Sequence, residues 1–327
     1  MDRIIIGVDG GGSKSTGAAA DRSGRVLAVA RNCGINYNNI GMEKAREHLC
    51  ALVNELTRKC GADYEQLMIG HCAADGTMDR ETVEKVAGTM LDPNRMVIES
   101  DAYMALLGLT KGEPGLIAIC GTGSMLVMDD GKNGQRAAGG WGHLLGDPGS
   151  GYALALDGLK AAIACWERTG PDTALGDRAL QYFHISQPRQ LIDRVYAPGF
   201  GQKELADFAP MVIGAAEEND QAALDILNKN MLDLAKEAWM LLKDAPDVKI
   251  VGLYGGIFQH ALIARKMFCG HLEAMAQARE LRFTLPDYPP ELGALIHYFR
   301  GKGQLTEDLL FRMKTSYDAL VKGGNIA

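Results

Sequence analysis

The sequence predicts an α/β protein that consists of two similar domains, and three observations lead to this prediction. A β-branched run at Ile4–Ile6 leads into the glycines Gly10–Gly12, which is typical of a buried strand that ends in a tight turn. A second stretch of the same design begins near Gly115. Segments with helical apolar periodicity alternate with short strand-like runs along the rest of the chain. A length of 327 residues also favours two domains.

The first glycine turn has the groups that hold a phosphate. Gly11 and Gly12 leave backbone N–H groups uncovered, and Ser13 and Lys14 add a hydroxyl and a positive charge. Small apolar residues follow, then a second turn and a third apolar run, so we predict a β-hairpin at this point. An ordinary hairpin with a glycine-rich turn and no ligand is the alternative interpretation.

Two better-known nucleotide-binding loops do not fit this stretch. Ser13 separates Gly12 from Lys14, which breaks the spacing of a P-loop, and Ser15 stands where a dinucleotide-binding fingerprint needs its third glycine. Both motifs also open a helix, whereas the segment after the turn is strand-like. A third kind of nucleotide-binding loop is a glycine-turn hairpin with an acidic residue just before the turn. In this arrangement the turn binds phosphate and a metal ion lies near Asp9.

The next segments alternate between loops, helices and strands. We expect a polar loop at 33–39, where Asn36 offers hydrogen bonds to a polyhydroxylated ligand unless the loop is a plain turn. The apolar patterns then predict helices at 42–59 and 81–90 and strands at 67–72 and 96–98.

Asp101 comes at the end of a predicted strand and the start of a predicted helix. Open α/β sheets bind their ligands at the carboxyl ends of strands, so Asp101 is a candidate catalytic carboxylate. The alternative is that Asp101, or Ser100 before it, only caps the helix.

A second copy of the opening stretch indicates an internal repeat. Residues 117–124, IAICGTGS, match residues 6–13, IGVDGGGS, at a shift of 121 − 10 = 111. Each domain is then expected to open with a glycine-turn hairpin, and a nucleotide held by both turns would lie in a cleft between the domains. At this shift Cys120 takes the place of Asp9; only one acid is needed near a metal ion, and a second would repel phosphates.

A loop with six glycines at 139–152 follows the second hairpin. So many glycines exclude a helix or a strand interior. Trp141 offers an apolar ring face and Asp147 a strong hydrogen-bond acceptor, a pairing that suits a sugar. Packing of Trp141 into a domain interface is the alternative.

The remaining chain is predicted to be mostly helical to about residue 242, with a loop at 167–177. A strand at 248–253 then ends in Gly255 and Gly256, whose bare backbone would let a flat ring lie against it. We expect a further strand at 282–285 and helices at 291–299 and 306–321, the last for packing or a dimer contact.

Composition excludes several classes of function. A net charge of −7 without a basic cluster argues against nucleic acid as a partner. No apolar run approaches the roughly 18 residues that a membrane span needs, and the N-terminus lacks the apolar core of a signal peptide. The seven scattered cysteines contain no CxxC pair, which favours reduced thiols in a cytoplasmic protein.

The order of these motifs resembles a known family. DGGGSKS, SDA, GTGS, GGWGHLLGDPGS and YGGIF follow one another as they do in the BadF/BadG/BcrA/BcrD-type ATPases, and within them in N-acetylglucosamine kinase-like sugar kinases. The resemblance spans roughly Ile4 to Leu295. It implies two ribonuclease-H-like domains of the actin-like ATPase fold, 1–111 and 112–327, which face a central cleft that binds ATP and Mg²⁺. In this arrangement the last helices of the second domain can also pack against the first domain.

The resemblance also implies roles for individual residues. Asp9 would help to hold Mg²⁺, Asp101 would be the catalytic base and a sugar contact, and Gly255 with Gly256 would flank the adenosine. The phosphate-binding residues would be Gly11, Gly12, Ser13, Lys14, Gly121, Thr122 and Gly123. The sugar-binding residues would be Asn36, Gly140, Trp141, Gly142 and Asp147.

The expected function is therefore that of a kinase that transfers the γ-phosphate of ATP to a hydroxyl of an amino sugar such as N-acetylglucosamine or glucosamine. We expect O6 to be the hydroxyl and the protein to be a homodimer. Two alternatives stay open. The first is an ATP-hydrolysing activator of a radical dehydratase or reductase, which would need cysteines placed to share an iron–sulfur cluster. The second is a sugar sensor without catalysis.

Overall fold

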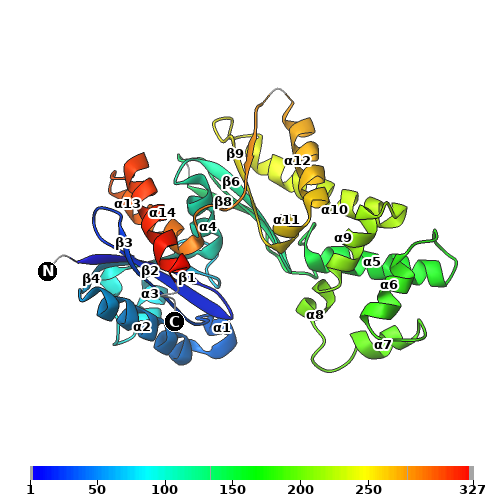
Figure 1. Cartoon of the computed structure of the whole chain (residues 1–327), viewed down its shortest axis with the longest axis horizontal. Coiled ribbons are helices and arrows are strands. Elements are labelled where there is room, and N and C mark those ends of the chain that lie inside the picture. Colours follow the sequence, from blue (N-terminus) through cyan, green and yellow to red (C-terminus); the bar gives the residue numbers. More distant parts are fainter. Residues whose placement is uncertain (1–2, 133, 278, 324–327) are drawn as a thin grey trace. The chain divides into compact units, whose positions relative to one another are not determined.

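The structure is a computed structural model that describes residues 3–132, 134–277 and 279–323. The chain forms two compact units (Figure 1), of which the first contains Met1–Pro114 with Pro286–Ala327 and the second contains Gly115–Leu285. This grouping differs from the division into 1–111 and 112–327 that the sequence analysis proposed. The reason is that the last two helices, α13 (Pro290–Gly301) and α14 (Glu307–Lys322), pack on the sheet of the first unit.

The first unit contains a five-stranded sheet in the order β3-β2-β1-β4-β5. Its strands are β1 (Ile4–Gly10), β2 (Lys14–Ala20), β3 (Val26–Cys33), β4 (Tyr64–His71) and β5 (Met96–Ser100). Alternate residues of a strand point to opposite faces, so Ile4, Ile6 and Val8 share a core with the helices on one side. Those helices are α2 (Met42–Cys60) and α3 (Arg80–Ala87).

The opposite face of this sheet is covered by α4 (Asp101–Thr110), α13 and α14 (Figure 1). Helices α13 and α4 approach unusually closely, because a Cβ on Gly293 would lie 1.8 Å from the backbone oxygen of Met104. Only glycine permits this distance, so Gly293 fixes the contact. The C-terminal segment therefore completes the sheet packing of the unit that begins at the N-terminus.

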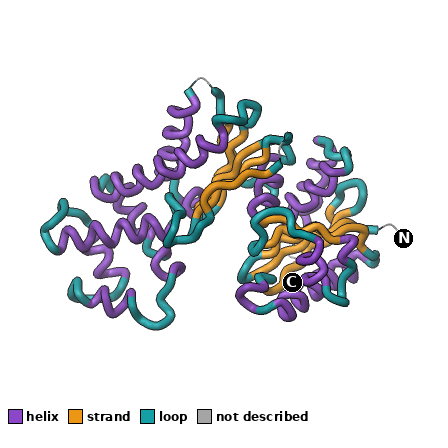
Figure 2. Tube along the Cα trace, turned by 180° about the vertical axis from the view of Figure 1, so that it is seen from behind, coloured by secondary structure: helices purple, strands orange, loops and turns teal. Residues whose placement is uncertain are grey.

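The second unit contains a five-stranded sheet in the order β10-β9-β6-β7-β8, and Figure 2 shows its helices gathered on one side of the strands. Its strands are β6 (Gly115–Cys120), β7 (Ser124–Asp129), β8 (Gln135–Gly139), β9 (Ile250–Tyr254) and β10 (Arg282–Thr284). Its helices are α5 (Gly151–Trp166), α6 (Leu175–Tyr182), α7 (Gln190–Val195), α8 (Gln202–Ala206), α9 (Ala209–Glu217), α10 (Gln221–Leu242), α11 (Gly256–His260) and α12 (Leu262–Ala276).

The two sheets have the same topology, which confirms the predicted repeat. Each consists of an antiparallel three-stranded meander whose first strand pairs in parallel with a later strand, β4 in one unit and β9 in the other. The predicted shift of 111 needs a correction at the turn. Strand β1 ends at Gly10 and β6 ends at Cys120, a shift of 120 − 10 = 110, so Ile119 takes the place of Asp9. The position still has no acidic counterpart.

Within the described ranges, none of the helices has the length and apolar character needed to cross a bilayer.

Candidate active site

The first glycine turn is held in place by the segment that follows β3. Gly11 donates its N–H to the carbonyl of Lys14 at 3.1 Å, and Ile35 donates to the carbonyl of Gly11 at 3.1 Å. Gly34 packs so closely that a Cβ there would lie 2.2 Å from the oxygen of Gly12. Ser13 and Lys14 are exposed at the tip of the hairpin. The turn is thus rigid at its base and open at its tip, as an anion-binding turn requires.

Asp9, near the end of β1, lies in a concentration of negative charge. Burial, followed by the carboxylates of Glu291 and Asp101, raises the pKa of Asp9 from 3.8 to about 7, and Lys14 opposes this only partly. A bound cation would relieve the repulsion among these three carboxylates. The donor chemistry of Asp9 therefore fits a divalent metal such as Mg²⁺.

Asp101 is the first residue of α4, and it does not cap the helix. Ser100 is the cap, since its hydroxyl accepts a hydrogen bond from the N–H of Tyr103 at 3.1 Å. One carboxylate oxygen of Asp101 accepts from the N–H of Ala102 at 2.7 Å. Burial raises the pKa of Asp101 above its ordinary value, although the backbone amides oppose this. A fixed carboxylate with an elevated pKa suits general-base catalysis.

Asn36 and Asp101 have a shared neighbour that the sequence did not single out. Asn36 caps the short helix α1 (Tyr37–Ile40), where its side-chain oxygen accepts from the N–H of Asn38 at 3.0 Å. Its side chain also lies beside the thiol of Cys72 and acts to lower the pKa of that thiol. Burial, and after it the charge of Asp101, raises the pKa of Cys72 to about 11, so this thiol stays protonated beside the carboxylate. Cys72 directly follows β4, and this position at the carboxyl end of a strand was the feature that could have identified it from the sequence.

The second glycine turn, Gly121–Gly123, is bound to the start of α5. The N–H of Gly121 donates to the carbonyl of Gly123 at 2.9 Å, and the N–H of Gly151 donates to the carbonyl of Gly121 at 2.8 Å. The N–H of Tyr152 reaches the carbonyl of Thr122 at 3.2 Å. The turn and the helix N-terminus therefore form one rigid corner.

A cavity of about 580 Å³ opens beside this corner. Small and apolar residues form most of its wall, with Asp207, Glu217 and His260 as polar groups. Gly255, with φ at 94°, brings the end of β9 against β6, because a Cβ there would lie 2.3 Å from the oxygen of Cys120. The full lining is Gly121, Thr122, Gly151, Ala206, Asp207, Ala209, Pro210, Ile213, Gly214, Glu217, Gly256, Ile257, His260 and Ala261.

The size and wall of this cavity suit a nucleoside with its phosphates directed to the turn. The sequence predicted Gly121, Thr122 and Gly256 at such a site, and the structure brings them to one cavity. The wall that α8 and α9 supply was missed, because those helices showed only an amphipathic pattern.

The loop at 139–150 combines an exposed ring with a buried carboxylate. Gly140 and Gly142 have φ values of 70° and 81°, which glycine adopts without strain. Trp141 between them is 74% exposed, whereas Asp147 is 3% exposed and has a φ of 62°. The exposed Trp141 leaves a ring face free for a ligand in this unit.

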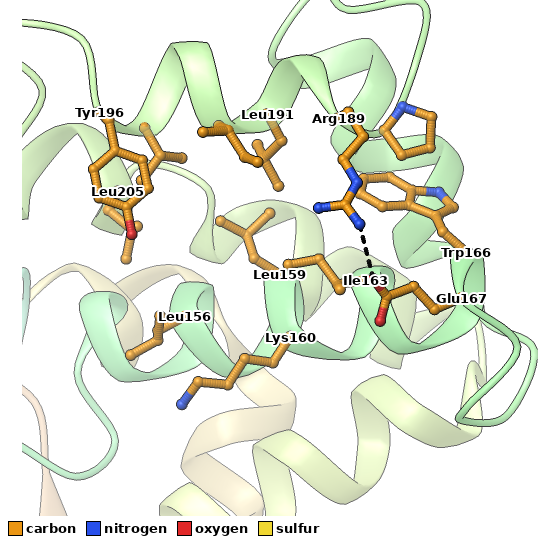
Figure 3. A pocket seen from close by; sticks show the side chains of 13 residues that line it. Leu156, Leu159, Lys160, Ile163, Trp166, Glu167, Arg189, Leu191, Tyr196 and Leu205 are labelled. Atoms are coloured by element: carbon orange, nitrogen blue, oxygen red, sulfur yellow. Dashed lines mark ion pairs between the residues drawn. The ribbon is translucent and has the colours of Figure 1, made fainter.

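A second cavity of about 470 Å³ lies elsewhere in the second unit, between α5 and α7 (Figure 3). Leu159, Ile163 and Leu191 point into it, and an ion pair of 3.8 Å between Glu167 and Arg189 closes one end. Its wall is mainly aliphatic and none of the predicted site residues contributes to it. The predicted phosphate and sugar contacts therefore lie outside this cavity.

All seven cysteines have free thiols. Across the described residues, no three side chains of His, Cys, Asp or Glu gather in a way that would hold a metal ion by themselves. A metal at Asp9 would accordingly need ligands from water or from a bound phosphate.

Comparison with known proteins gives consistent matches over most of the chain. A family model described as the BadF/BadG/BcrA/BcrD ATPase family matches residues 6–296. The N-acetylmuramic acid/N-acetylglucosamine kinase of Clostridium acetobutylicum is 29% identical over 249 residues, which cover 75% of this chain and 80% of that protein. The N-acetyl-D-glucosamine kinase of Dictyostelium discoideum is 28% identical over 266 residues, covering 76% and 81%.

A solved structure shares the fold. It belongs to a Chromobacterium violaceum protein described as a candidate N-acetylglucosamine kinase, with a TM-score of 0.70 at 23% identity over 90% of this chain and 98% of that one. The predicted actin-like ATPase fold, with its two α/β sheets, is thereby confirmed.

Proposed function

The chain belongs to the BadF/BadG/BcrA/BcrD ATPase family, and we propose that it is an ATP-dependent sugar kinase that acts on an amino sugar such as N-acetylglucosamine or glucosamine. The relatives named above are sugar kinases, which supports this assignment over an activator of a radical enzyme. One observation carries the proposal furthest. A half-buried carboxylate, Asp101, is oriented by a backbone amide in the same unit as a rigid glycine turn and Asp9.

In the proposed reaction, Asp101 accepts the proton of a sugar hydroxyl, O6 in our assignment. The hydroxyl oxygen forms a bond to the γ-phosphorus of ATP, while the bond between that phosphorus and the bridging oxygen breaks and ADP leaves with its electron pair. The raised pKa of Asp101 brings its proton affinity closer to neutral pH, where a base is most effective.

The proposed phosphate contacts come from both glycine turns, and their N–H groups would stabilise charge on the transferred phosphoryl group. Asp9 would hold Mg²⁺, which would neutralise phosphate charge. In our assignment, the contacts to phosphate are Gly11, Gly12, Ser13, Lys14, Gly121, Thr122 and Gly123, those to adenosine are Gly255 and Gly256, and those to the sugar are Asn36, Gly140, Trp141, Gly142 and Asp147.

The first test is ADP release by the purified protein with Mg²⁺ and ATP across amino sugars, N-acylated sugars and neutral hexoses. We expect one sugar class to stimulate ADP release and to yield a phosphorylated product by mass spectrometry. Hydrolysis that no sugar stimulates, together with iron in anaerobically purified protein, would instead support the radical-enzyme activator. Nucleotide and sugar binding without any product would support a sensor.

A homodimer and a cytoplasmic location stay predictions of the sequence. Sedimentation of the purified protein tests the first of them directly.

A further inference from the structure

We infer that His71, the last residue of β4, is a positioning residue that couples the first glycine turn, at 10–13, to the loop that contains Asn36. This inference rests on the proposed kinase function, because that function gives the turn and Asn36 their roles. It depends on an imidazole ring whose two nitrogens bond two different loops of the first unit.

His71 is buried, and both of its ring nitrogens have a hydrogen-bond partner. The residue is 1% exposed. Its Nδ1 atom accepts a hydrogen bond from the N–H of Ala73 at 3.0 Å, so this nitrogen carries no proton. The proton is therefore on Nε2, which donates to the carbonyl of Ile35 at 3.0 Å. Burial lowers the pKa of His71, which favours the same neutral form.

The two loops that His71 joins both hold the first glycine turn. Ile35, in the loop after β3, donates its N–H to the carbonyl of Gly11 at 3.1 Å. Cys72, which follows His71, donates its N–H to the carbonyl of Gly10 at 3.1 Å. The imidazole therefore connects the two segments against which the turn rests, and the hydrogen bonds form a closed ring.

Close packing around the imidazole extends this ring to Asn36. A Cβ on Gly10 would lie 2.5 Å from Cδ1 of Ile35, so the side chain of Ile35 packs directly on the start of the turn. The ring of Tyr37, the first residue of α1, lies 4.9 Å from the imidazole between centroids, at 32°. Asn36 stands between these two residues in the chain, so both of its neighbours contact His71.

A neutral imidazole suits this position because it has one donor and one acceptor on a rigid ring. An aliphatic side chain of similar size would leave the carbonyl of Ile35 and the N–H of Ala73 without these partners. The amide of asparagine lies near the position of Nδ1, and the amide of the longer glutamine lies near that of Nε2. The two amide side chains therefore separate the two hydrogen bonds of His71.

The decisive experiment compares His71→Asn with His71→Gln in the full-length protein. Asparagine can still accept from Ala73 but does not reach the carbonyl of Ile35, whereas glutamine does. His271→Asn is the control, since it makes the same change at a partly exposed site of the second unit where the ring bonds Asn228. Fluorescent-nucleotide titration gives the Kd for ATP, steady-state kinetics give the KM for the sugar, and thermal unfolding verifies the fold.

We expect His71→Asn to raise both the Kd for ATP and the KM for the sugar by about 5-fold or more, because the buried carbonyl of Ile35 loses its donor. His71→Gln should stay within about 3-fold of the parent protein in both constants, because it restores that donor. His271→Asn should equal the parent protein.

Amide hydrogen exchange adds a measurement that needs no turnover. In His71→Asn the amides of 10–13 and 33–39 should exchange faster together, because the two segments lose their common support. In His71→Gln they should exchange as in the parent protein. If the parent protein phosphorylates no sugar, the proposed function fails, whereas this measurement still decides whether His71 couples the turn to the loop.

Two results would overturn the inference while leaving the kinase function standing. One is an equal rise of the two constants in His71→Asn and His71→Gln. The other is a His71→Asn protein that is less stable but has an unchanged Kd and KM, since the role of His71 would then be purely structural.

Tyr37→Leu takes the place of His71→Asn if that variant does not fold. It removes the partly exposed ring beside His71, and we expect the same two constants to rise about 2- to 10-fold, the range for a lost contact between rings. Unchanged constants in Tyr37→Leu would overturn the inference.

Discussion

Gly123 of the second glycine turn lies directly against the carboxylate of Asp147, since a Cβ on Gly123 would be 2.7 Å from Oδ2. The proposed phosphate contact and the proposed sugar contact are therefore in van der Waals contact with each other. Any side chain at residue 123 has to displace the buried carboxylate. Phosphate binding and sugar binding in this unit are therefore coupled through the contact at Gly123.

Gly123→Ala is the direct test of this link. We expect KM for the sugar to rise about 10-fold or more, because overpacking of a rigid buried contact costs about 1–3 kcal/mol. Steady-state kinetics with saturating ATP measures the effect. Gly270→Ala, in α12 with open space around it, is the control and should leave KM unchanged. A normal KM in Gly123→Ala would contradict the rigid contact.

Asp101→Asn tests the proposed base. The amide keeps the shape but cannot accept the proton, so we expect kcat to fall by about 10²- to 10⁴-fold while ATP binding persists. Pre-steady-state product formation and nucleotide titration measure the two quantities. Asp75→Asn changes an exposed carboxylate in the loop after β4 and should retain normal turnover. If Asp101→Asn turned over normally, another group would have to be the base.

Gly256→Val tests the cavity as the nucleotide site. No atom lies within 4 Å of a Cβ on Gly256, so the larger side chain can extend into the cavity without unfolding the protein. We expect the Kd for ATP to rise more than about 10-fold, a change of about 1.4 kcal/mol. Fluorescent-nucleotide titration measures it. Gly301→Val, which also has open space, should bind ATP normally, and equal Kd values for both variants would place the nucleotide elsewhere.

Asp9 makes the stability of the metal-free protein depend on pH. Its pKa is about 7 in the fold and 3.8 as a free group. Below the lower value both states are protonated. Between the two values the unfolded chain loses the proton and the folded protein keeps it, so the contribution of Asp9 falls as pH rises and is constant above about 7.

The substitution Asp9→Asn removes this decrease in the free energy of unfolding with rising pH. In the presence of a chelator we expect the variant to gain up to about 4 kcal/mol over the parent protein at pH 8 and little at pH 4. Urea unfolding at both values measures the difference. Asp225→Asn, at an exposed site, should show no such pH dependence. A variant with the same stability difference at both pH values would rule out an elevated pKa.

Tyr317→Phe tests the buried contact between α14 and α13. The Tyr317 hydroxyl donates a hydrogen bond to Glu291, which is 3% exposed. Its removal leaves a buried carboxyl without that donor, so we expect a loss of about 1–3 kcal/mol in the free energy of unfolding. Tyr196→Phe, where the ring is 83% exposed, is the control and should change stability little. Equal stability of the two variants would mean that the Glu291 contact contributes nothing.

The sequence predicted most elements of the two sheets because hydrophobic periodicity and glycine turns are local signals. It located Asp101 for the same reason, since a strand followed by a helix start is visible in five or six residues. It assigned the repeat one residue off at Asp9, because Gly10 pairs with Ser15 whereas Cys120 pairs with Ser124, so the first turn is one residue longer.

Local sequence patterns could not identify residues whose place in the site depends on contacts with distant parts of the chain. Glu217 and Asp207 reach the cavity only because α8 and α9 pack beside the second glycine turn. Cys72 gains its interest from Asn36 and Asp101, which are far from it in the chain.

The composition of the first unit from two chain segments has a consequence for biosynthesis. Residues 115–285 are continuous and can assemble as soon as they leave the ribosome, whereas β1 and α4 lack their partner α13 until residues 290–301 have been synthesised. A nascent chain would therefore expose the apolar face of its N-terminal sheet throughout the translation of the second unit. Premature termination before residue 286 would leave that face uncovered permanently, which makes truncated chains targets for chaperones and proteases.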